Sequence, residues 1–357
     1  MNFQDKTANL DSSRFTKRYL FLLDAFRQIN CSIVEKEDKE VTRLLDTYSQ
    51  APDLATSGRR YIKNIIQHWA ASKREYPIHL SFTNPINPAL FGIFGLTVGS
   101  ATTLRCFFEF WAEFSRILFI FNSASFEETD EYGILTFIPD QDVIEDNIFT
   151  QTIQGFMSAS ISNLRTVSSA SFCPDKLSLP VGSSENIRSE FSQIAGCEVV
   201  VSEQKVGKLF IKKERLQTLL PAGDSYSNLT YYQLAAKRIS ELFPDNMVLK
   251  VRSWIVDSIL QNNIDTADIS KDLGLSLEYI NQKLAEQDTD IQKLKNQVTP
   301  VIARHLLQQP GVQIKEIAFK LGYTSSSSFN KAYNRWMNES PAEYRKSYTD
   351  RINNLKF

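Results

Sequence analysis

A near-repeat in the last third of the chain is the feature that most constrains the fold. Its two copies are residues 269–276 (ISKDLGLS) and 317–324 (IAFKLGYT), with turn glycines 48 residues apart. Glycine supplies the positive φ that a tight turn between two helices demands. Ser276 and Thr324 stand where a side-chain oxygen would cap the helix that follows. The repeat predicts two helix-turn-helix units, with a small residue (Ser270 or Ala318) allowing the two helices of each unit to pack closely.

Helical spacing predicts which face of each second helix is exposed. In the second copy Phe329, Ala332, Tyr333 and Trp336 share the inner side. The outer side and the start of that helix carry small polar and basic residues: Ser325, Ser326, Ser327, Asn330, Lys331, Asn334 and Arg335. In the first copy Leu277, Ile280 and Leu284 are expected to face inward, which leaves an outward set of Ser276, Glu278, Tyr279, Gln282 and Lys283.

Polar and basic side chains on an exposed helix suit DNA base edges and phosphates. An ordinary solvated helix face would explain either copy alone. The duplicated turn chemistry favours DNA binding, because a helix-turn-helix unit places its second helix in the major groove. We therefore predict that both outward sets contact double-stranded DNA.

The second copy also resembles a known family. Residues 311–345 are similar to the signature segment of the AraC/XylS transcription regulators, through residues 317–318 (IA), 321–323 (LGY), 328–329 (SF), 331–333 (KAY), 335–336 (RW) and 340–345 (SPAEYR). With the first copy, the resemblance covers residues 247–346. It implies two small helical bundles joined by a connecting helix, with both second helices in successive major-groove segments, roughly 34 Å apart. It further implies RNA polymerase as a partner if the chain is an activator.

Several residues depart from the family pattern. Glu278 and Gln282 stand where the family usually carries arginine, so we expect the second copy to make the stronger DNA contacts. Asp288 and Asn338 replace two usual glycines, and both residue types tolerate left-handed backbone. Pro300 is acceptable only in a first helical turn, which predicts that the connecting helix, at about residues 298–307, begins near Thr299. Residues 340–343 (SPAE) form a capping box ahead of a last helix.

The front part of the chain predicts an α+β domain of helices on a small sheet. Helical spacing covers residues 15–26, 61–69 and 143–164, and a loop rich in Pro and Asn covers 77–88. An aromatic run at 102–121 predicts a buried helix. Alternation predicts a hairpin from residues 123–128 and 133–138, and short strands at 176–179, 198–202 and 208–211, the last two joined around Gly207.

These patterns divide the chain into three parts. Residues 1–225 form the front domain, residues 226–246 a connector with a helix at about 227–243, and residues 247–357 an all-helical domain with the two units. Residues 10–242 resemble the effector-binding domain of the ornithine- and arginine-responsive AraC/XylS branch, through 90–96 (LFGIFGL), 100–104 (SATTL), 208–210 (KLF) and 219–221 (LLP). That resemblance implies that the front domain binds a small molecule or self-associates as a homodimer. The aromatic run (Phe107, Phe110, Trp111, Phe114) could line such a pocket, although core packing explains it better.

Composition excludes several classes of protein. The net charge is -1, yet residues 247–357 carry 15 Lys and Arg against 12 Asp and Glu, whereas the preceding residues carry 25 against 29. This weak asymmetry fits a separate DNA-binding domain. The four scattered cysteines and three histidines (His68, His79, His305) form no spacing suited to a metal. We expect no metal, no cofactor and no enzyme activity, since no nucleophile–base pair or phosphate loop is evident.

The apolar runs at 91–98 and 117–121 are too short for a membrane span, and the polar residues 1–14 do not read as a signal peptide. A soluble, cytoplasmic transcription regulator is the expectation. Two alternatives stay open: a small-molecule effector on the front domain controls DNA binding, or the front domain only dimerises and senses no ligand.

Overall fold

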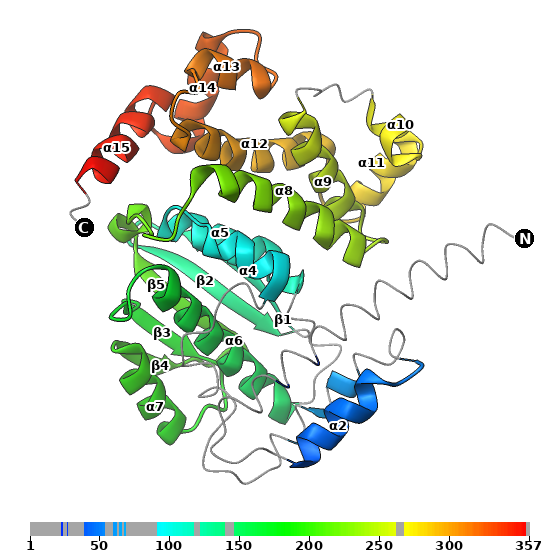
Figure 1. Ribbon diagram of the computed structural model, residues 1–357, viewed down its shortest axis with the longest axis vertical. Coiled ribbons are helices and arrows are strands. Elements are labelled where there is room, and N and C mark those ends of the chain that lie inside the picture. Colours follow the sequence, from blue (N-terminus) through cyan, green and yellow to red (C-terminus); the bar gives the residue numbers. More distant parts are fainter. Residues whose placement is uncertain are drawn as a thin grey trace, which may run out of the picture. The chain divides into compact units, whose positions relative to one another are not determined.

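A computed structural model describes residues 23, 27, 39–53, 60–62, 64–65, 68, 91–117, 122–139, 146–261 and 268–354. The chain divides into two compact units. Unit 1 comprises Met1–Gly99 and Thr103–Thr218, and unit 2 comprises Ser100–Thr102 and Leu219–Phe357 (Figure 1). Along the described ranges, no helix is both long enough and apolar enough to cross a membrane.

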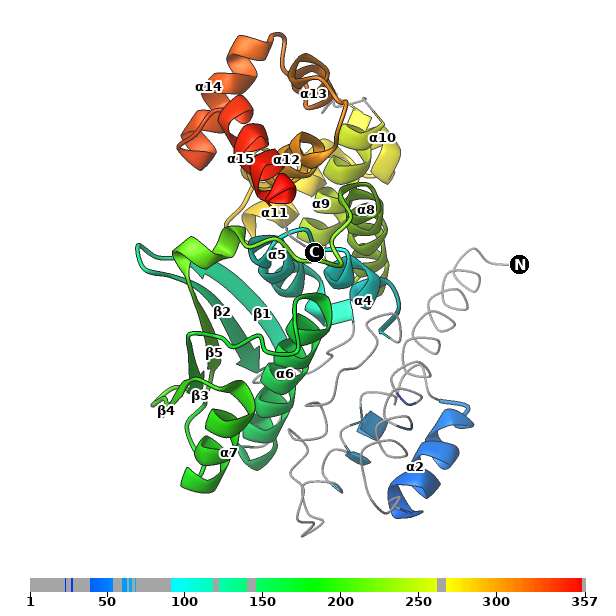
Figure 2. The same cartoon turned by 60° about the vertical axis from the view of Figure 1, so that its left-hand side comes forward.

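Unit 1 is built on a five-stranded mixed sheet of order β1-β2-β5-β3-β4 (Figure 2). The strands are β1 (Asn122–Glu128), β2 (Tyr132–Pro139), β3 (Lys176–Leu179), β4 (Glu198–Val201) and β5 (Gly207–Lys212). The predicted hairpin is confirmed as the antiparallel pair β1–β2. Although β4 and β5 follow each other in sequence, β3 lies between them and pairs parallel with β4. A parallel pair needs a crossover, which α7 (Glu185–Ala195) supplies and which the sequence analysis did not anticipate.

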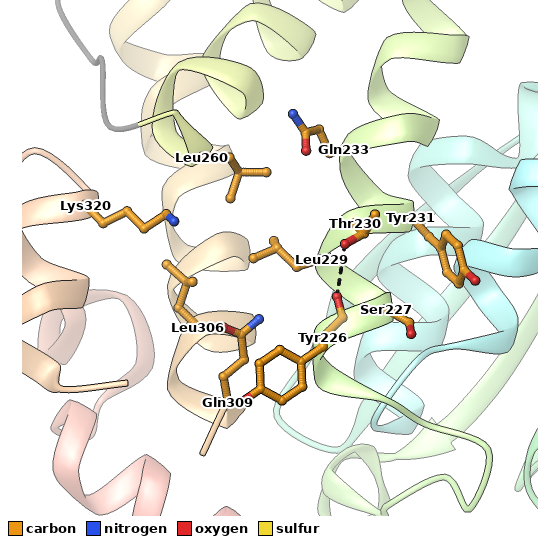
Figure 3. A pocket seen from close by; sticks show the side chains of 10 residues that line it. All are labelled: Tyr226, Ser227, Leu229, Thr230, Tyr231, Gln233, Leu260, Leu306, Gln309 and Lys320. Carbon is orange, nitrogen blue, oxygen red and sulfur yellow. Dashed lines mark hydrogen bonds between the residues drawn. The ribbon is translucent and has the colours of Figure 1, made fainter. Parts of the chain in front are cut away.

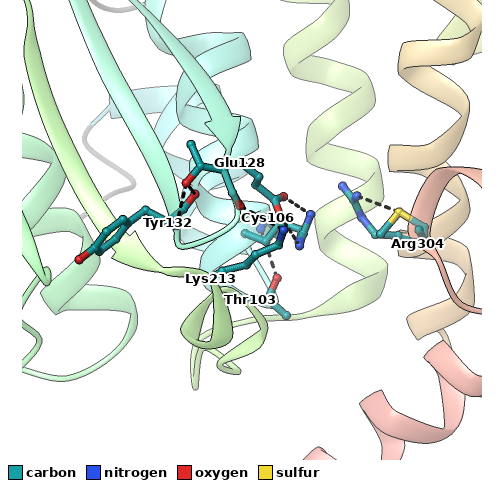
Figure 4. A network of polar contacts seen from close by, with 9 residues as sticks. Thr103, Cys106, Glu128, Tyr132, Lys213 and Arg304 are labelled. Carbon is teal, nitrogen blue, oxygen red and sulfur yellow. Dashed lines mark hydrogen bonds and ion pairs between the residues drawn. The ribbon is translucent and has the colours of Figure 1, made fainter.

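Unit 1 also contains the helices α4 (Gly92–Gly99), α5 (Leu104–Phe114) and α6 (Asp146–Val167), and the short η3 (Ser115–Ile117) and η4 (Lys213–Gln217). Both α5 and α6 pack on β2, so the predicted arrangement of helices on a small sheet is confirmed. Thr103 caps α5 by accepting the backbone N–H of Cys106 at 3.2 Å (Figure 4). Arg105 then joins α5 to the hairpin, with Nη2 donating to Oε2 of Glu128 at 2.8 Å.

The aromatic run of α5 forms the core of unit 1. Phe107, Phe110, Trp111 and Phe114 have no exposed surface. The Trp111 ring stacks on Phe107 at 5.5 Å and meets Phe156 of α6 at 5.8 Å. These rings therefore pack against one another, and the core interpretation of the run is confirmed.

The amino-terminal predictions fall largely outside the described residues. Leu23 and Ile65 are helical and buried, in agreement with the predicted helices around them. Most of 15–26, part of 61–69, the whole of the 77–88 loop, His79 and Cys31 lie outside the description. The helix α2 (Lys39–Ser49), which was not predicted, buries Val41 and Leu45.

Unit 2 is helical from residue 225 onward. Its helices are α8 (Ser225–Leu242), α9 (Met247–Leu260), α10 (Ile269–Leu273), α11 (Leu277–Ala285), α12 (Ile291–Gln308), α13 (Ile314–Lys320), α14 (Ser326–Met337) and α15 (Pro341–Asn353). The helix expected at 227–243 corresponds to α8, which packs on α9 and α12 and belongs to unit 2. Residues 100–102 also belong to this unit. Thr102 donates to Gln308 of α12 at 2.8 Å, and Gln308 donates to Tyr344 of α15 at 2.7 Å.

The predicted start of the connecting helix is wrong. The helix α12 begins at Ile291, is capped by Asp290 accepting from the backbone N–H of Lys293 at 2.7 Å, and contains Pro300 in its interior. Pro300 removes one backbone hydrogen bond. Burial of Leu294 and Val298 before the proline, and of Ile302 after it, holds the helix together across that position.

Candidate nucleic-acid interface

The two copies of the sequence repeat form two helix pairs with the same turn. We name α10 with α11 the first pair, and α13 with α14 the second pair. Gly274 and Gly322 have φ of 65° and 82°, as predicted. After each glycine, the next backbone N–H returns to the preceding helix: Leu275 to Ser270 at 3.1 Å, and Tyr323 to Ala318 at 2.9 Å. The sequence repeat is thus a repeat of the same hydrogen bonds that end a helix.

The residue that caps the helix after the turn lies one position further from the glycine in the second pair than in the first. Ser276 caps α11, as predicted, by accepting the N–H of Tyr279 at 3.2 Å. The prediction for Thr324 is wrong, because Ser325 caps α14 by accepting the N–H of Ser328 at 3.1 Å. The second turn holds one residue more between its glycine and its helix, so the capping position moves along the chain by one.

Alanine at the observed cap should therefore cost more than alanine at the predicted one. We expect Ser325→Ala to lower the free energy of unfolding by about 1 kcal/mol, since it leaves a helix N–H without its acceptor. Thr324→Ala is the matched control, and we expect a change within about 0.5 kcal/mol. Urea unfolding of the full chain followed by circular dichroism measures both. Equal losses in the two variants would contradict the assigned cap.

The predicted outward face of α14 is exposed. Phe329 and Tyr333 have no exposed surface, and Ala332 is buried beside them. Trp336 is half-buried, its ring 6.3 Å from Tyr323. Of the residues predicted on the outer side and at the helix start, Ser326 is half-buried. The others are exposed: Ser325, Ser327, Asn330, Lys331, Asn334 and Arg335.

The helix α14 thus presents polar side chains that are available to a ligand. Among the described residues, no hydrogen bond or ion pair engages the side chains of Asn330, Lys331, Asn334 or Arg335. Such a face can donate to phosphates through Lys331 and Arg335 and can both donate and accept through the two asparagine amides.

The face of α11 carries less available positive charge. Ser276, Glu278, Tyr279 and Gln282 are exposed as predicted. Lys283 is half-buried and donates to Oε1 of Glu286 at 2.9 Å, a hydrogen bond that raises the pKa of the lysine. Because Glu286 neutralises that charge, α11 has no basic side chain comparable to those of α14.

The prediction that Leu277 faces inward is wrong. Ile280 and Leu284 of α11 have no exposed surface, whereas Leu277 is 46% exposed. Leu277 is the first residue of α11, and its partner helix α10 has only five residues and buries only Ile269. A helix this short does not extend far enough to cover the side chain.

The first pair contacts the rest of unit 2 through α9. Trp254 of α9 is nearly buried, and its indole N–H donates to Oδ2 of Asp272 in α10 at 2.9 Å. This contact leaves no signal in the sequence, because a lone Trp and an Asp within a helix follow no recognisable spacing.

Two non-glycine residues adopt left-handed backbone, as predicted. Asp288 and Asn338 have φ of 53° and 54°, and no other described residue except glycine has a positive φ. Asn338 ends α14, its N–H donating to Asn334 at 2.8 Å. The predicted capping box is also confirmed, since Ser340 N–H donates to Glu343 at 2.7 Å and Glu343 N–H donates to Ser340 at 3.2 Å.

His305 lies inside the helical unit and packs as expected for a core residue. It is 1% exposed, and its ring lies 6.2 Å from that of Tyr232. The pKa of His305 is lowered from 6.5 to about 3, mainly because the ring is buried and secondly because of the positive charge of Arg304. The neighbouring Arg304 has its Nη1 3.8 Å from the sulfur of Met337 (Figure 4).

Unit 2 should consequently lose stability in mild acid. The folded state keeps His305 neutral, so its stability is intact above the unfolded pKa of 6.5 and is lost as the pH falls towards 3. Between pH 6.5 and 5 we expect a loss of about 2 kcal/mol, at about 1.4 kcal/mol per pH unit. His305→Phe should flatten this dependence in urea unfolding of the full chain. An unchanged pH slope in that variant would contradict the assignment.

Metal ligands do not gather in the part of the chain that is described. No group of three or more His, Cys, Asp or Glu side chains there could hold a metal ion.

The segment that holds the two helix pairs matches a known family of domains. A family model described as a helix-turn-helix domain matches residues 269–347. Two uncharacterized HTH-type transcriptional regulators, from Mycobacterium bovis and Mycobacterium tuberculosis, are each 30% identical over 77 residues, which are 22% of this chain and 22% of each relative. The Msm operon regulatory protein of Streptococcus mutans is 31% identical over 94 residues, covering 26% of this chain and 34% of that protein. The chain thus spans well under two thirds of these relatives.

Two solved structures are also similar. The transcriptional regulator CdpR from Pseudomonas aeruginosa aligns over 88% of this chain and 99% of that chain, with a TM-score of 0.43 and 17% identity. A DNA-binding transcriptional dual regulator from Escherichia coli K-12 aligns over 29% of this chain and 94% of that chain, with a TM-score of 0.28 and 26% identity. Residues 269–347, which hold both helix pairs, are therefore a helix-turn-helix domain similar to segments of transcriptional regulators.

Proposed function

We propose that the protein is a sequence-specific DNA-binding transcription regulator of the AraC/XylS type, with α11 and α14 as its two recognition helices. The observation that carries this proposal is α14, which buries an aromatic inner side and leaves Asn330, Lys331, Asn334 and Arg335 exposed within a helix-turn-helix domain. A helix fixed in this way by its inner side can enter the major groove without losing core contacts.

The roles proposed for the side chains follow their chemistry. Lys331 and Arg335 contact phosphates or guanine, and Asn330 and Asn334 offer amides to adenine. Ser325, Ser326 and Ser327 lie at the start of α14, where small hydroxyls and backbone N–H groups approach a phosphate.

On α11, the proposed contacts are weaker. Glu278 accepts from cytosine N4, and Ser276, Tyr279, Gln282 and Lys283 supply further polar contacts. Since Lys283 already donates to Glu286, α11 contributes less phosphate binding than α14.

The helix α12 is proposed to set the distance between the two recognition helices. Its 18 residues correspond to a length of about 27 Å, which is comparable to the roughly 34 Å between successive major-groove segments. Both recognition helices would then face the same side of the duplex.

Selection of duplexes from a random library by the full chain tests this proposal. We expect enrichment of two short sequence boxes about 10 base pairs apart, because successive grooves repeat at that interval. A library without enrichment after several rounds at physiological salt would contradict sequence-specific binding. Enrichment of a single box would contradict the role given to α11.

We further propose that a small-molecule effector on unit 1 controls DNA binding. The connectivity supports this proposal, because three of the four residues between α4 and α5 of unit 1, Ser100–Thr102, belong to unit 2. There Leu220 N–H donates to Thr102 at 3.0 Å, and Asn228 donates to the Ser100 carbonyl at 3.1 Å. A change in α4 or α5 would therefore act through the chain on α12, to which Thr102 is bonded.

The second candidate is a unit 1 that only dimerises. An effector raises the melting temperature of the protein by mass action, whereas a purely dimerising unit responds only to protein concentration. Thermal unfolding against a library of small metabolites, at two protein concentrations, separates the two. RNA polymerase is a further proposed partner if the regulator activates transcription.

A further inference from the structure

Unit 2 contains a cavity whose lining includes no residue of α14. Its volume is about 480 Å³, and its lining comes from α8, α9, α12 and α13 (Figure 3). Pockets that hold small organic ligands have volumes of roughly 300–1,000 Å³. The cavity is therefore large enough for a small organic molecule.

The lining combines an apolar surface with a single charge. Leu229, Leu260 and Leu306 supply the apolar part, and the ring of Tyr226 stands beside Gln309 (Figure 3). Lys320 is the only charged residue of the lining, and no acidic residue is among the ten that form it. A cavity with an apolar part and one cation is complementary to a molecule that has an apolar part and one negative charge.

Several neutral polar side chains of the lining are already engaged by the protein. Tyr226 Oη donates to the Pro310 carbonyl at 3.1 Å, and Gln309 Nε2 donates to the Ser225 carbonyl at 3.3 Å. Gln233 Nε2 donates to Asp257 at 2.7 Å. Lys320, by contrast, makes no hydrogen bond or ion pair with any described residue. Its ammonium group is thus the charged group of the lining that is available to bind a ligand.

We propose that this cavity binds a small aromatic anion, with its carboxylate or sulfonate on Lys320 and its ring among the three leucines and Tyr226. This site goes beyond the effector proposed for unit 1, because it is built entirely from residues of unit 2. Binding requires only the cavity and Lys320. The consequence for DNA rests on the proposed function.

That consequence follows from the position of Lys320. It is the last residue of α13, two residues before Gly322 in the turn of the second pair. A bound anion would join α13 to α8 and α12, and so would favour one position of the second pair relative to the rest of unit 2. If DNA binds one position of the second pair more tightly than the other positions, a ligand that favours a particular position changes the affinity for DNA.

Fluorescence titration of the full chain with 8-anilinonaphthalene-1-sulfonate, an aromatic anion, tests the site. We expect one saturable site, and a Kd raised about tenfold or more in Lys320→Gln, because a charge-assisted contact is lost. Lys315→Gln is the matched control, since Lys315 is exposed on the same helix and does not line the cavity. Its Kd should stay within about twofold of the wild type.

A second variant tests the cavity without touching the lysine. Thr230 lines the cavity but is exposed on α8, so Thr230→Trp fills the space while leaving the core of unit 2 intact. We again expect a Kd raised about tenfold or more, with far-ultraviolet circular dichroism unchanged. Equal affinity in Lys320→Gln and Lys315→Gln, unaltered affinity in Thr230→Trp, or fluorescence that does not saturate at one probe per chain would overturn the site.

DNA binding is measured in a separate experiment, so that the ligand site and the proposed function can be contradicted independently. Probe binding that persists in a protein without DNA preference overturns the proposed function alone. DNA preference in a protein without a saturable probe site overturns the ligand site alone.

Discussion

The double variant Lys331→Ala/Arg335→Ala is expected to bind its specific DNA about 100-fold more weakly than the wild type at physiological salt. Each side chain is exposed on α14 and is free of ion pairs within the described residues. A hydrogen bond to a charged group contributes about 1.5–3 kcal/mol, and two losses at the lower end of that range correspond to about two orders of magnitude. If both residues bind phosphates, the slope of log K against log salt should fall by about 1.8.

The control removes the same charge elsewhere. Lys205 and Lys237 are exposed, on the β4–β5 connection and on α8. Lys205→Ala/Lys237→Ala should leave affinity within about threefold and the salt slope unchanged, because neither residue is on a recognition helix. Equal losses of DNA affinity in the two double variants would mean that only the net charge of the protein matters. That result would contradict the role of α14. Glu278→Ala, which removes a negative charge from α11, should cost little affinity for specific DNA or even strengthen non-specific binding.

Trp111→Ala should destabilise unit 1 by about 3–5 kcal/mol, the usual cost of removing a fully buried aromatic side chain. Trp111 has no exposed surface and contacts Phe94 at 5.2 Å, Phe107 at 5.5 Å and Phe156 at 5.8 Å. These partners come from α4, α5 and α6, so the cavity would be enclosed on several sides and could not easily collapse. Denaturant unfolding followed by the remaining tryptophans and by circular dichroism measures the loss.

Leu96→Ala is the control in the same unit. Leu96 lies in α4 and is 37% exposed, so its truncation removes little buried surface and should cost less than about 1 kcal/mol. A loss for Trp111→Ala of the same size would mean that the aromatic run is not the core of unit 1. It would then favour the interpretation that these rings line a ligand pocket.

Local signals in the sequence account for much of this structure. The glycines at 274 and 322, and the replacement residues Asp288 and Asn338, all have the left-handed backbone expected of them. Turn chemistry can be predicted because it depends on a single residue and its φ. The β1–β2 hairpin was predictable for a similar reason, since its two strands are adjacent in sequence.

Features that depend on distant neighbours were missed or predicted wrongly. The parallel pairing of β3 with β4 joins segments 22 residues apart and leaves no local mark. Leu277 has the spacing of a core residue, but only the short α10 determines whether it is covered. Pro300 suggested a helix start, whereas burial on both sides of it sustains α12.

Binding of the full chain to the intergenic DNA upstream of its own gene tests the central claim most directly. Fluorescence anisotropy would compare that fragment with a scrambled fragment of equal length, both at one fixed physiological salt concentration. We predict a preference of at least about 1,000-fold for the native fragment, the lower end of the range for specific regulators. The affinity for that fragment should fall about 100-fold in Lys331→Ala/Arg335→Ala. Equal affinity for the two fragments, unchanged by that double variant, would contradict a sequence-specific role for α14.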